Sequence, residues 1–434
     1  MSAMPASANS TPRRPLRVLY FIGSYGPAAM GNASHEETIL ALRARGHSVD
    51  VFTQVTEPGR AAFLRSTHGG VPVYSVNLSA KGSRFARAMR PLALRLLQYE
   101  YLPVLLRAYR RHLGTHRYDL VHVEGAYPFG LVAALGSGGT PFMANVQGAD
   151  VIKLPEADYG YRRFRMPDLT VRMVLKRAAL VRVISPFLRD YVVREGLARA
   201  GQMVVVLRSI EDAAFPPPDS DLDAFRGAAR RWLADRYGVG LDRPLLVSLS
   251  RLHPFKGLEF LVDAIPAIVA EQRQRGGQPP WFLICGPSRS TEHFGDYKQF
   301  LRNRAESLGV AQHIVFTGQV AHEDVRAHLA GAEILVCPSI IEAQNKVVPE
   351  ACAVGTPSVV TTTTGITSYL EPMEACVAVP PRSAARIAGA VGDLLSNPGR
   401  YADVQGHALD AAETLRKEAL TPLLEQAWYR AAGR

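Results

Sequence analysis

Short apolar runs alternate with segments of helical periodicity along the whole chain, and the alternation occurs twice. β-Branched and other apolar residues dominate these runs, which is typical of strands buried on both faces of a parallel sheet. Strand–helix alternation predicts doubly wound α/β units, and 434 residues accommodate two of them. The expected strands are residues 18–22, 49–53, 120–123, 141–145 and 180–184 in the first half, and 245–250, 282–285, 314–316, 334–337 and 358–361 in the second.

Three prolines at 216–218 and the acidic stretch 219–223 mark a boundary between the halves, because Pro and Asp clusters are typical of linkers. The helical pattern from residue 398 onward is long enough to cross back to the first half. The predicted organisation is a disordered tail (1–15), an N-terminal Rossmann-like unit (16–215), a linker (216–242), a C-terminal Rossmann-like unit (243–397) and a final helix that crosses back (398–434).

Positive charge is concentrated in the first half. The chain has 50 Lys and Arg against 39 Asp and Glu; residues 1–215 carry 28 and 15 of these, and residues 216–434 carry 22 and 24. The first half therefore favours an anionic partner. Its basic stretches 84–112 and 161–194 have two interpretations: a surface for anionic lipid or an anionic acceptor, or solvated helix faces. No nucleic-acid motif accompanies the charge, so we expect no nucleic-acid partner.

The cysteines and the hydropathy predict a cytoplasmic protein. The four cysteines show no CxxC or Cys/His zinc spacing, which predicts reduced core thiols. No stretch approaches the ~20 apolar residues of a membrane span. The basic first half leaves a peripheral contact with the inner membrane face as an expectation. Dinucleotide, P-loop and zinc-protease patterns are absent from the sequence, so we expect neither a nicotinamide cofactor nor a metal.

A cationic loop follows the first expected strand of the second half. After residue 249 the sequence reads Ser-Arg-Leu-His-Pro-Phe-Lys-Gly, and a helix then begins. Ligands of doubly wound sheets bind outside the carboxyl ends of the strands. Arg251 and Lys256 lie five residues apart there, so the guanidinium fork and the mobile ammonium can converge on one anion.

Two carboxylates follow another strand of the same sheet. Glu342 lies in the loop after the expected strand 334–337, and Glu350 lies in the first turn of the next helix, which Pro349 favours. Carboxylate oxygens match the paired hydroxyls of a ribose or a sugar, and a helix N-terminus favours an anion. Together with the cationic loop, these groups describe a site for a nucleoside diphosphate sugar.

The chain resembles glycosyltransferase family 4 over nearly its whole length. The resemblance rests on R-L-x-x-x-K-G from Arg251, E-x7-E from Glu342 and A-x-G-x-P from Ala353. It implies the GT-B fold, with an acceptor-side N-terminal unit facing a nucleotide-sugar-binding C-terminal unit. It also implies retaining, metal-independent hexosyl transfer from a UDP- or GDP-linked sugar, with no further cofactor.

Carried over by position, the resemblance makes Arg251 and Lys256 the clamp on the donor diphosphate, with Glu342 at the transferred sugar and Glu350 at the ribose. The two cations and Glu342 would form the catalytic set. Four further donor-side positions follow from the resemblance: Asn345, Lys346 and Val347 facing sugar and phosphates, Gly31 in the loop after the first strand, and Val320 near the base.

The sequence departs from the family pattern mainly on the sugar and acceptor side. Gln344-Asn345 replace a common Phe-Gly pair; Asn tolerates a left-handed backbone, so the loop is expected to form. Glu124 replaces a His near the transferred sugar, and Gln147-Gly148-Ala149-Asp150 replace His-Gly-x-Asp. The usual Asn-Gly-Val-Asp becomes residues 208–211. Glu124, Gln147 and Asp150 are the candidate sugar- and acceptor-side residues.

Three alternatives remain open. A GT-B epimerase or phosphorylase would isomerise or phosphorolyse sugars without acceptor-dependent transfer. A non-catalytic nucleotide-sugar-binding subunit would bind the donor without turning it over. A basic membrane-surface scaffold would bind anionic vesicles but no nucleotide. The complete set of Arg251, Lys256, Glu342 and Glu350 argues against the last two.

Overall fold

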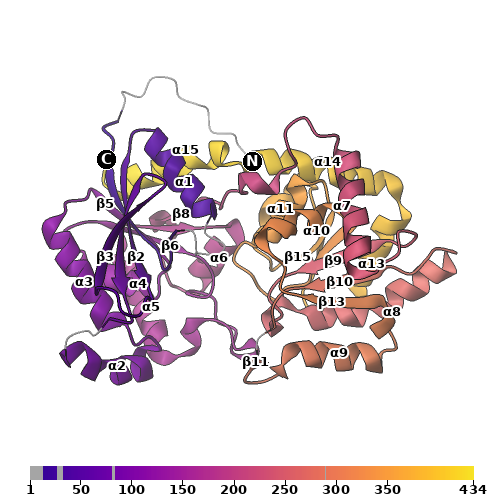
Figure 1. Ribbon diagram of the computed structural model, residues 1–434, viewed down its shortest axis with the longest axis horizontal. Helices are drawn as coiled ribbons and strands as arrows, with labels where there is room; N and C mark the ends of the chain where they lie inside the picture. The colour runs from indigo at the N-terminus through magenta and orange to yellow at the C-terminus, as the bar shows by residue number, and fades with distance from the viewer. Residues whose placement is uncertain (1–12, 27–32, 81–83, 289) are drawn as a thin grey trace.

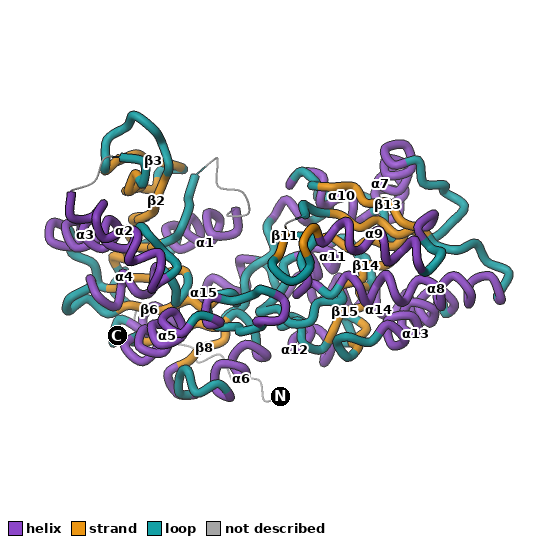
Figure 2. Tube along the Cα trace, turned by 90° about the horizontal axis from the view of Figure 1, so that it is seen from below, coloured by secondary structure: helices purple, strands orange, loops and turns teal. Residues whose placement is uncertain are grey.

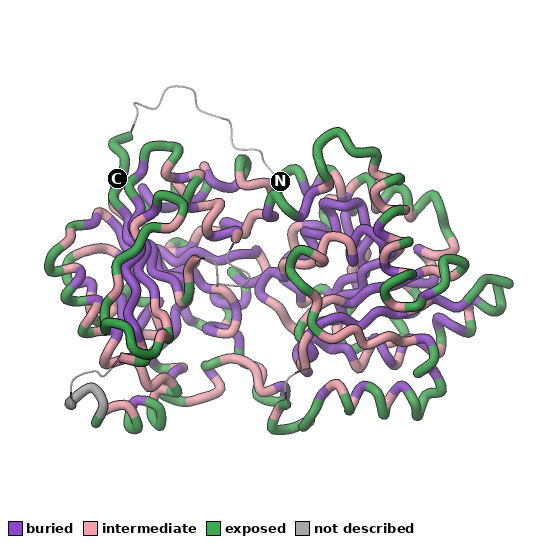
Figure 3. Tube along the Cα trace, in the orientation of Figure 1, coloured by how far each residue is buried: buried purple, intermediate pink, exposed green. Residues whose placement is uncertain are grey.

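The computed structural model describes residues 13–26, 33–80, 84–288 and 290–434 (Figure 1). Most of the expected N-terminal tail, residues 1–12, and the predicted donor-site residue Gly31 lie outside the described residues. The described chain forms two α/β units side by side, each with a sheet of buried strands at its centre (Figures 1 and 3).

The first sheet has eight strands in the order β3-β4-β2-β1-β5-β6-β7-β8, all paired in parallel except β3 with β4. The five strands predicted in this half are confirmed. The β3–β4 hairpin was not predicted, although Gly69 and Gly70 at its turn both have positive φ, the usual hairpin signal. The strands are β1 (Arg17–Phe21), β2 (Ser48–Val55), β3 (Phe63–His68), β4 (Val71–Asn77), β5 (Leu120–Glu124), β6 (Phe142–Val146), β7 (Leu180–Val183) and β8 (Met203–Val205).

Alternate residues of β1 enter the cores on opposite faces of this sheet. Leu19 and Phe21 pack with the helices between β4 and β8, whereas Val18 and Tyr20 pack with α1 (Ala33–Ala44) and with the C-terminal α15 (Lys417–Ala431). Both faces are therefore covered, as a largely parallel sheet requires. The other helices of this unit are α2 (Arg84–Leu97), α3 (Leu102–Thr115), α4 (Phe129–Gly136), α5 (Arg165–Arg177) and α6 (Pro186–Arg194).

The second sheet has six parallel strands in the order β13-β10-β9-β14-β15-β16, and its five predicted strands are confirmed. Its strands are β9 (Leu245–Leu249), β10 (Trp281–Cys285), β13 (Ile314–Gly318), β14 (Ile334–Cys337), β15 (Ser358–Thr361) and β16 (Val377–Val379). Its helices are α7 (Leu222–Tyr237), α8 (Leu258–Gln274), α9 (Tyr297–Ser307), α10 (Val325–Ala330), α11 (Val347–Ala353), α12 (Thr367–Leu370), α13 (Ala384–Ser396) and α14 (Pro398–Thr414). All four cysteines are free and buried, as expected.

Two expectations differ from the structure. Most of the expected linker is α7, which packs on the second core through Ala229 and Leu233. The expected final helix is two helices: α14 packs on the second unit, and only α15 crosses to the first. Helix α9 begins at Tyr297, where the Asp296 carboxylate caps it, and a short hairpin, β11 (Ser290–Thr291) and β12 (Gly295–Asp296), precedes it.

The two units lie next to each other (Figures 1 and 2). The carboxyl ends of their strands face each other, and a cavity between the units is lined by residues of both. The chain passes between the units twice, through the segment after β8 and at the start of α15. This arrangement confirms the predicted pair of facing Rossmann-like units. In the part of the chain that the structure describes, no helix has the length and apolar character to cross a bilayer.

Candidate active site between the two sheets

The main cavity between the units has a volume of about 210 Å³. It lies at the carboxyl ends of β6, β7, β9 and β14, where ligands of doubly wound sheets bind. Six predicted site residues line it: Gln147, Arg251, Lys256, Glu342, Asn345 and Lys346. Residues that were predicted from the sequence to form one site therefore line one cavity.

The predicted pair of Lys256 and Glu342 is in direct contact, with 2.5 Å between the Lys256 Nζ and Glu342 Oε1 atoms. Lys256 ends a short 3₁₀ turn after β9, and Gly257 follows it with φ +62°. A Cβ on Gly257 would lie 2.2 Å from the Pro338 carbonyl oxygen. Glycine is thus required at this position, where the loop after β9 lies close to the loop after β14. The closeness of the two loops brings the charges of Lys256 and Glu342 together.

Both oxygens of the Glu342 carboxylate are held. Oε1 accepts from Lys256, and Oε2 accepts from the Ser339 hydroxyl and the Asn345 amide, each at 3.0 Å. Burial alone would raise the pKa of Glu342, but these partners lower it below its ordinary value. Asn345 has φ +80°, so the predicted left-handed loop residue is confirmed. Glu342 is therefore an ionised, fixed carboxylate.

Arg251 differs from its neighbour Lys256 because it is exposed and has no carboxylate within ion-pair distance among the described residues. Its guanidinium carbon lies 5.8 Å from the centre of the Phe255 ring, which stacks on Tyr159 of the other unit at 4.0 Å. The cation lines the cavity, and its guanidinium donors have no acceptor among the described residues, so they can bind an anionic ligand.

Glu350, the predicted ribose ligand, lies behind the cavity lining. It is in the first turn of α11 with 4% of its surface exposed, and its Oε1 atom lies 3.5 Å from the Lys346 ammonium. Burial raises the pKa of Glu350, with Glu211 acting in the same direction and Lys346 opposing it. Val347 begins the same helix, and Val320 follows β13 outside the cavity.

Sequence reasoning missed Glu211 as an inter-unit contact. Its carboxylate accepts from Lys346 at 2.6 Å and from His322 at 2.8 Å, both of the second unit. It also accepts from the backbone N–H of Ser34 in α1, at 3.1 Å. The only signal was its place in the segment where the chain leaves the first unit.

Gln344 is one of the departures from the family pattern, and its amide connects the two units. The side-chain oxygen accepts from the Arg208 backbone N–H at 2.9 Å, and the side-chain NH₂ donates to the Arg208 carbonyl at 3.1 Å. Gln344 thus fastens the loop after β14 to the segment that connects the units.

Glu124 is buried behind Gln147 and does not line the cavity. The Trp428 indole, which can only donate, donates to His122 Nδ1, so His122 Nε2 carries the proton and donates to Glu124 at 2.9 Å. Tyr20 donates to the same carboxylate oxygen at 2.5 Å. Burial would raise the pKa of Glu124, but His35, His122 and nearby Arg182 lower it well below its ordinary value.

This ionised carboxylate orients Gln147. Asn145 and Gln147 both donate their NH₂ groups to the second oxygen of Glu124, which turns the Gln147 amide oxygen away from Glu124. The Asp150 carboxylate stabilises the same loop, because it accepts hydrogen bonds from the backbone N–H groups of Gln147, Gly148 and Ala126. Of the three candidates on this side, Gln147 reaches the cavity, whereas Glu124 and Asp150 support it.

Comparisons with known proteins agree with this architecture. Residues 32–208 match the family model described as glycosyl transferase 4-like domain, and residues 243–397 match that of glycosyl transferases group 1. GDP-mannose-dependent alpha-(1-6)-phosphatidylinositol monomannoside mannosyltransferase of Mycobacterium tuberculosis is 30% identical over 302 residues, which cover 67% of this chain and 70% of that protein. The protein of the same name from Mycolicibacterium smegmatis is 26% identical over 396 residues, covering 89% and 91%.

Solved glycosyltransferase structures share the fold. Sucrose-phosphate synthase from Thermosynechococcus elongatus superposes with a TM-score of 0.72 at 20% identity, covering 96% of this chain and 99% of that one. Anabaena HepE in complex with UDP and glucose superposes with a TM-score of 0.68 at 17% identity, covering 95% and 99%. The chain therefore belongs to the glycosyltransferases that combine a 4-like N-terminal domain with a group 1 C-terminal domain in the GT-B fold.

Proposed function

We propose that the chain is a retaining glycosyltransferase of family 4. It transfers a hexosyl group from a UDP- or GDP-linked sugar to an acceptor hydroxyl, without a metal ion or a further cofactor. The observation that supports this most strongly is the convergence of Arg251, Lys256 and Glu342 on one cavity between the units. Two cations and one fixed carboxylate match a diphosphate joined to a polyhydroxylated sugar.

The cations stabilise the leaving group. Breaking the bond between sugar and phosphate builds negative charge on the diphosphate. The guanidinium donors of Arg251 have no acceptor among the described residues. The Lys256 ammonium has three N–H donors, and one of them forms the hydrogen bond to Glu342. Fixed positive charge of this kind is preorganised electrostatic stabilisation, and it neutralises phosphate as Mg²⁺ does in other enzymes.

Glu342 positions the sugar rather than attacking it. Among the described residues that line the cavity it is the one carboxylate, whereas double displacement in retaining glycosidases uses two. Both of its oxygens already accept hydrogen bonds. These facts support substitution on a single face, in which the leaving phosphate takes the proton of the acceptor hydroxyl and the anomeric configuration is retained.

GDP-mannose is the first donor to test, because the two mannosyltransferases reported above are named as GDP-mannose-dependent. In our proposal Glu350 binds the ribose hydroxyls, and Val320 lies near the base. The position of Glu350 beside Lys346, a cavity residue, supports its assignment.

We also propose that the N-terminal unit presents the acceptor at the cytoplasmic face of an anionic membrane. Helix α2 exposes Leu92, Leu94 and Leu96, and the adjacent α5 exposes Met166 and Leu169. Among the described side chains, Arg95 of α2, Arg107 of α3 and Lys176 of α5 are exposed, form no ion pair and accompany these apolar residues. Such a surface combines the two interactions that hold a peripheral protein on anionic lipid.

The test is a screen of UDP- and GDP-sugars by thermal shift, followed by product analysis. A ligand at 100 times its Kd stabilises by about 2.7 kcal/mol, which is readily measured. We expect one nucleotide series to bind, EDTA to leave transfer unchanged, and NMR to show a retained anomeric configuration. Activity that requires added Mg²⁺ or Mn²⁺, or an inverted product, would contradict the proposal.

A further inference from the structure

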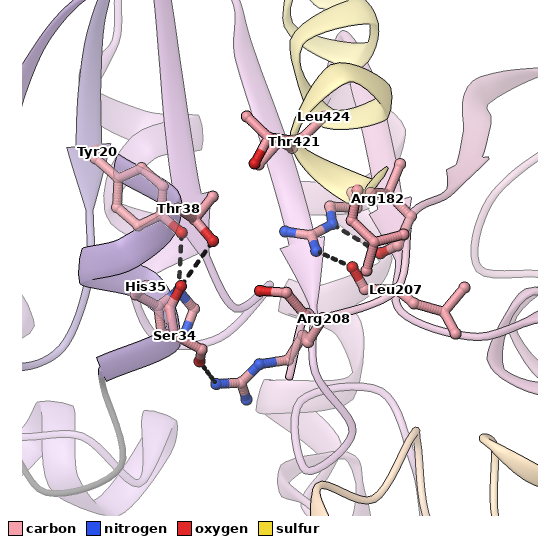
Figure 4. Close-up of a pocket in the computed structure, with 12 residues that line it drawn as sticks. Tyr20, Ser34, His35, Thr38, Arg182, Leu207, Arg208, Thr421 and Leu424 are labelled. Carbon is pink, nitrogen blue, oxygen red and sulfur yellow. Dashed lines mark hydrogen bonds between the residues drawn. The ribbon is translucent and has the colours of Figure 1, made fainter. Parts of the chain in front are cut away.

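A second, smaller cavity lies beside the active site, against the first turn of α1 and under α15 (Figure 4). Its volume is about 20 Å³, enough for one water-sized group. It shares Ser34, Arg208 and Ser209 with the main cavity, so the two adjoin. A ligand in the main cavity can therefore extend one polar group into it.

Arg182 of β7 forms one wall of this cavity. It is 5% exposed, and its Nε and Nη2 atoms donate to the Val206 and Leu207 carbonyls at 2.9 Å. These two bonds fix the guanidinium, whose remaining nitrogen points into the cavity (Figure 4). A buried cation is thus held rigidly with one donor face open.

Arg208 forms the opposite wall and places a second cation nearby. Its Nη2 atom donates to the Ser34 hydroxyl at 3.1 Å. Burial lowers the pKa of Arg182, Glu124 acts in the opposite direction, and the charge of Arg208 lowers it further. The two guanidinium groups therefore repel each other across the cavity.

Neither guanidinium has a carboxylate within 4.0 Å among the described residues. The rest of the chain offers none, because residues 1–12, 27–32, 81–83 and 289 include no Asp or Glu. Glu124, the acid that acts on Arg182 through space, already accepts from Tyr20, His122, Asn145 and Gln147. Buried charges in proteins are normally paired, so this pair of cations lacks a counter-ion.

The other polar groups around the cavity also suit an anion. The Ser209 hydroxyl has no partner within the described chain. The Ser34 hydroxyl accepts from Arg208, and its own proton has no acceptor among the described residues. Burial lowers the pKa of His35 to about 3, so this side chain is neutral and the positive charge comes from the arginines. A ligand atom here meets mainly hydrogen-bond donors.

We propose that this cavity is an oxyanion subsite, in which one oxygen of a carboxylate or phosphate group of the acceptor lies between Arg182 and Arg208. The inference rests on the proposed glycosyl transfer. The volume admits a single oxygen, so the rest of the group lies in the main cavity. The acceptor supplies the anion, because the donor diphosphate is assigned to Arg251 and Lys256 of the second unit, whereas Arg182 belongs to the first.

The test is calorimetry with inorganic phosphate and with acetate, on protein saturated with GDP or UDP so that the diphosphate position is occupied. We expect one further anion to bind per chain, and Arg208→Gln to weaken it by about tenfold or more, as for a charged hydrogen bond. Preference for phosphate or for acetate identifies which group the acceptor bears. Arg386→Gln, at an exposed position of α13 that lines neither cavity, is the matched control and should leave this second binding event unchanged.

The subsite is disproved if the nucleotide-saturated protein binds neither anion, or if Arg208→Gln binds as the unchanged protein does. If Arg208→Gln does not fold, Ser209→Ala takes its place, with an expected loss of about fivefold for a neutral hydrogen bond. Failure of the proposed function gives a different result, since the protein would then bind no nucleoside diphosphate in the first titration.

Discussion

Replacing Lys256 by Met should destabilise the second unit far more than replacing Arg251, the other cation of the same loop. The side chains of Lys256 and Glu342 are only 10% and 16% exposed, and their charged atoms are 2.5 Å apart. Methionine fills the same space but leaves the Glu342 carboxylate without its cation. Breaking a buried pair in this way costs about 3 kcal/mol. For a unit of this size that corresponds to a drop in Tm of roughly 6–12 °C.

The pH dependence gives a second measurement of the same pair. Burial would raise the pKa of Glu342, but Lys256 and the hydrogen bonds hold it below its ordinary value, so the pair stabilises the fold at neutral pH and this contribution is lost as acid protonates Glu342. In Lys256→Met burial dominates and the pKa of Glu342 rises. Acidification then relieves the buried charge, so the difference in Tm between the two proteins should shrink toward pH 5.

Differential scanning calorimetry of three variants tests the argument. Arg251→Met removes an exposed cation from the same loop and should change stability by less than about 0.5 kcal/mol. Lys256→Met/Glu342→Gln leaves no unpaired charge and should recover most of the lost stability. Equal Tm values for Lys256→Met and the unchanged protein at pH 7, or no recovery in the double variant, would refute the reasoning.

Three further predictions concern the active site. Glu342→Gln should lower kcat by about 100-fold while GDP or UDP affinity stays within about twofold, because its assigned partner is the sugar; equal loss of nucleotide affinity in calorimetry would refute this. Gln344→Ala leaves the Arg208 backbone groups without side-chain partners and should lower the free energy of unfolding in urea by about 1–3 kcal/mol. Gln344→Glu should also destabilise the protein, because a carboxylate cannot donate to the Arg208 carbonyl, and little effect of this variant would contradict the prediction. Glu124→Gln places an NH₂ group among neighbours that all donate, so the hydrogen bond from Gln147 should be lost. The Gln147 amide would then be free to turn, and the KM for the donor should rise. An unchanged KM would show that Gln147 does not contact the donor.

The sequence located the second unit's site better than the first unit's. Arg251, Lys256 and Glu342 lie in loops directly after strands, and the geometry of a parallel sheet brings such loops to one edge. The assignment of Asn345 to a left-handed position was correct for a similarly local reason. Alternation of apolar runs likewise located ten strands, because burial on both faces determines their composition.

The contacts of Glu124 and Glu211 could not be predicted from local pattern. The hydrogen bond from Trp428 to His122 joins residues 306 positions apart, and no spacing rule relates them. Glu211 contacts Ser34, His322 and Lys346 only because the units come together. Such contacts depend on the relative placement of whole elements, which helical and strand periodicity do not specify.

The return of α15 to the first sheet has a consequence for synthesis of the protein. Leu424, Ala427 and Trp428 cover the face of that sheet on which Val18 and Tyr20 lie. A ribosome makes all eight strands of the first sheet, and then the whole second unit, before it makes α15. Domains commonly fold in order as they emerge. We therefore expect the part of this face that α15 covers to stay exposed until the helix is made, and so to be open until then to chaperones and to other nascent chains.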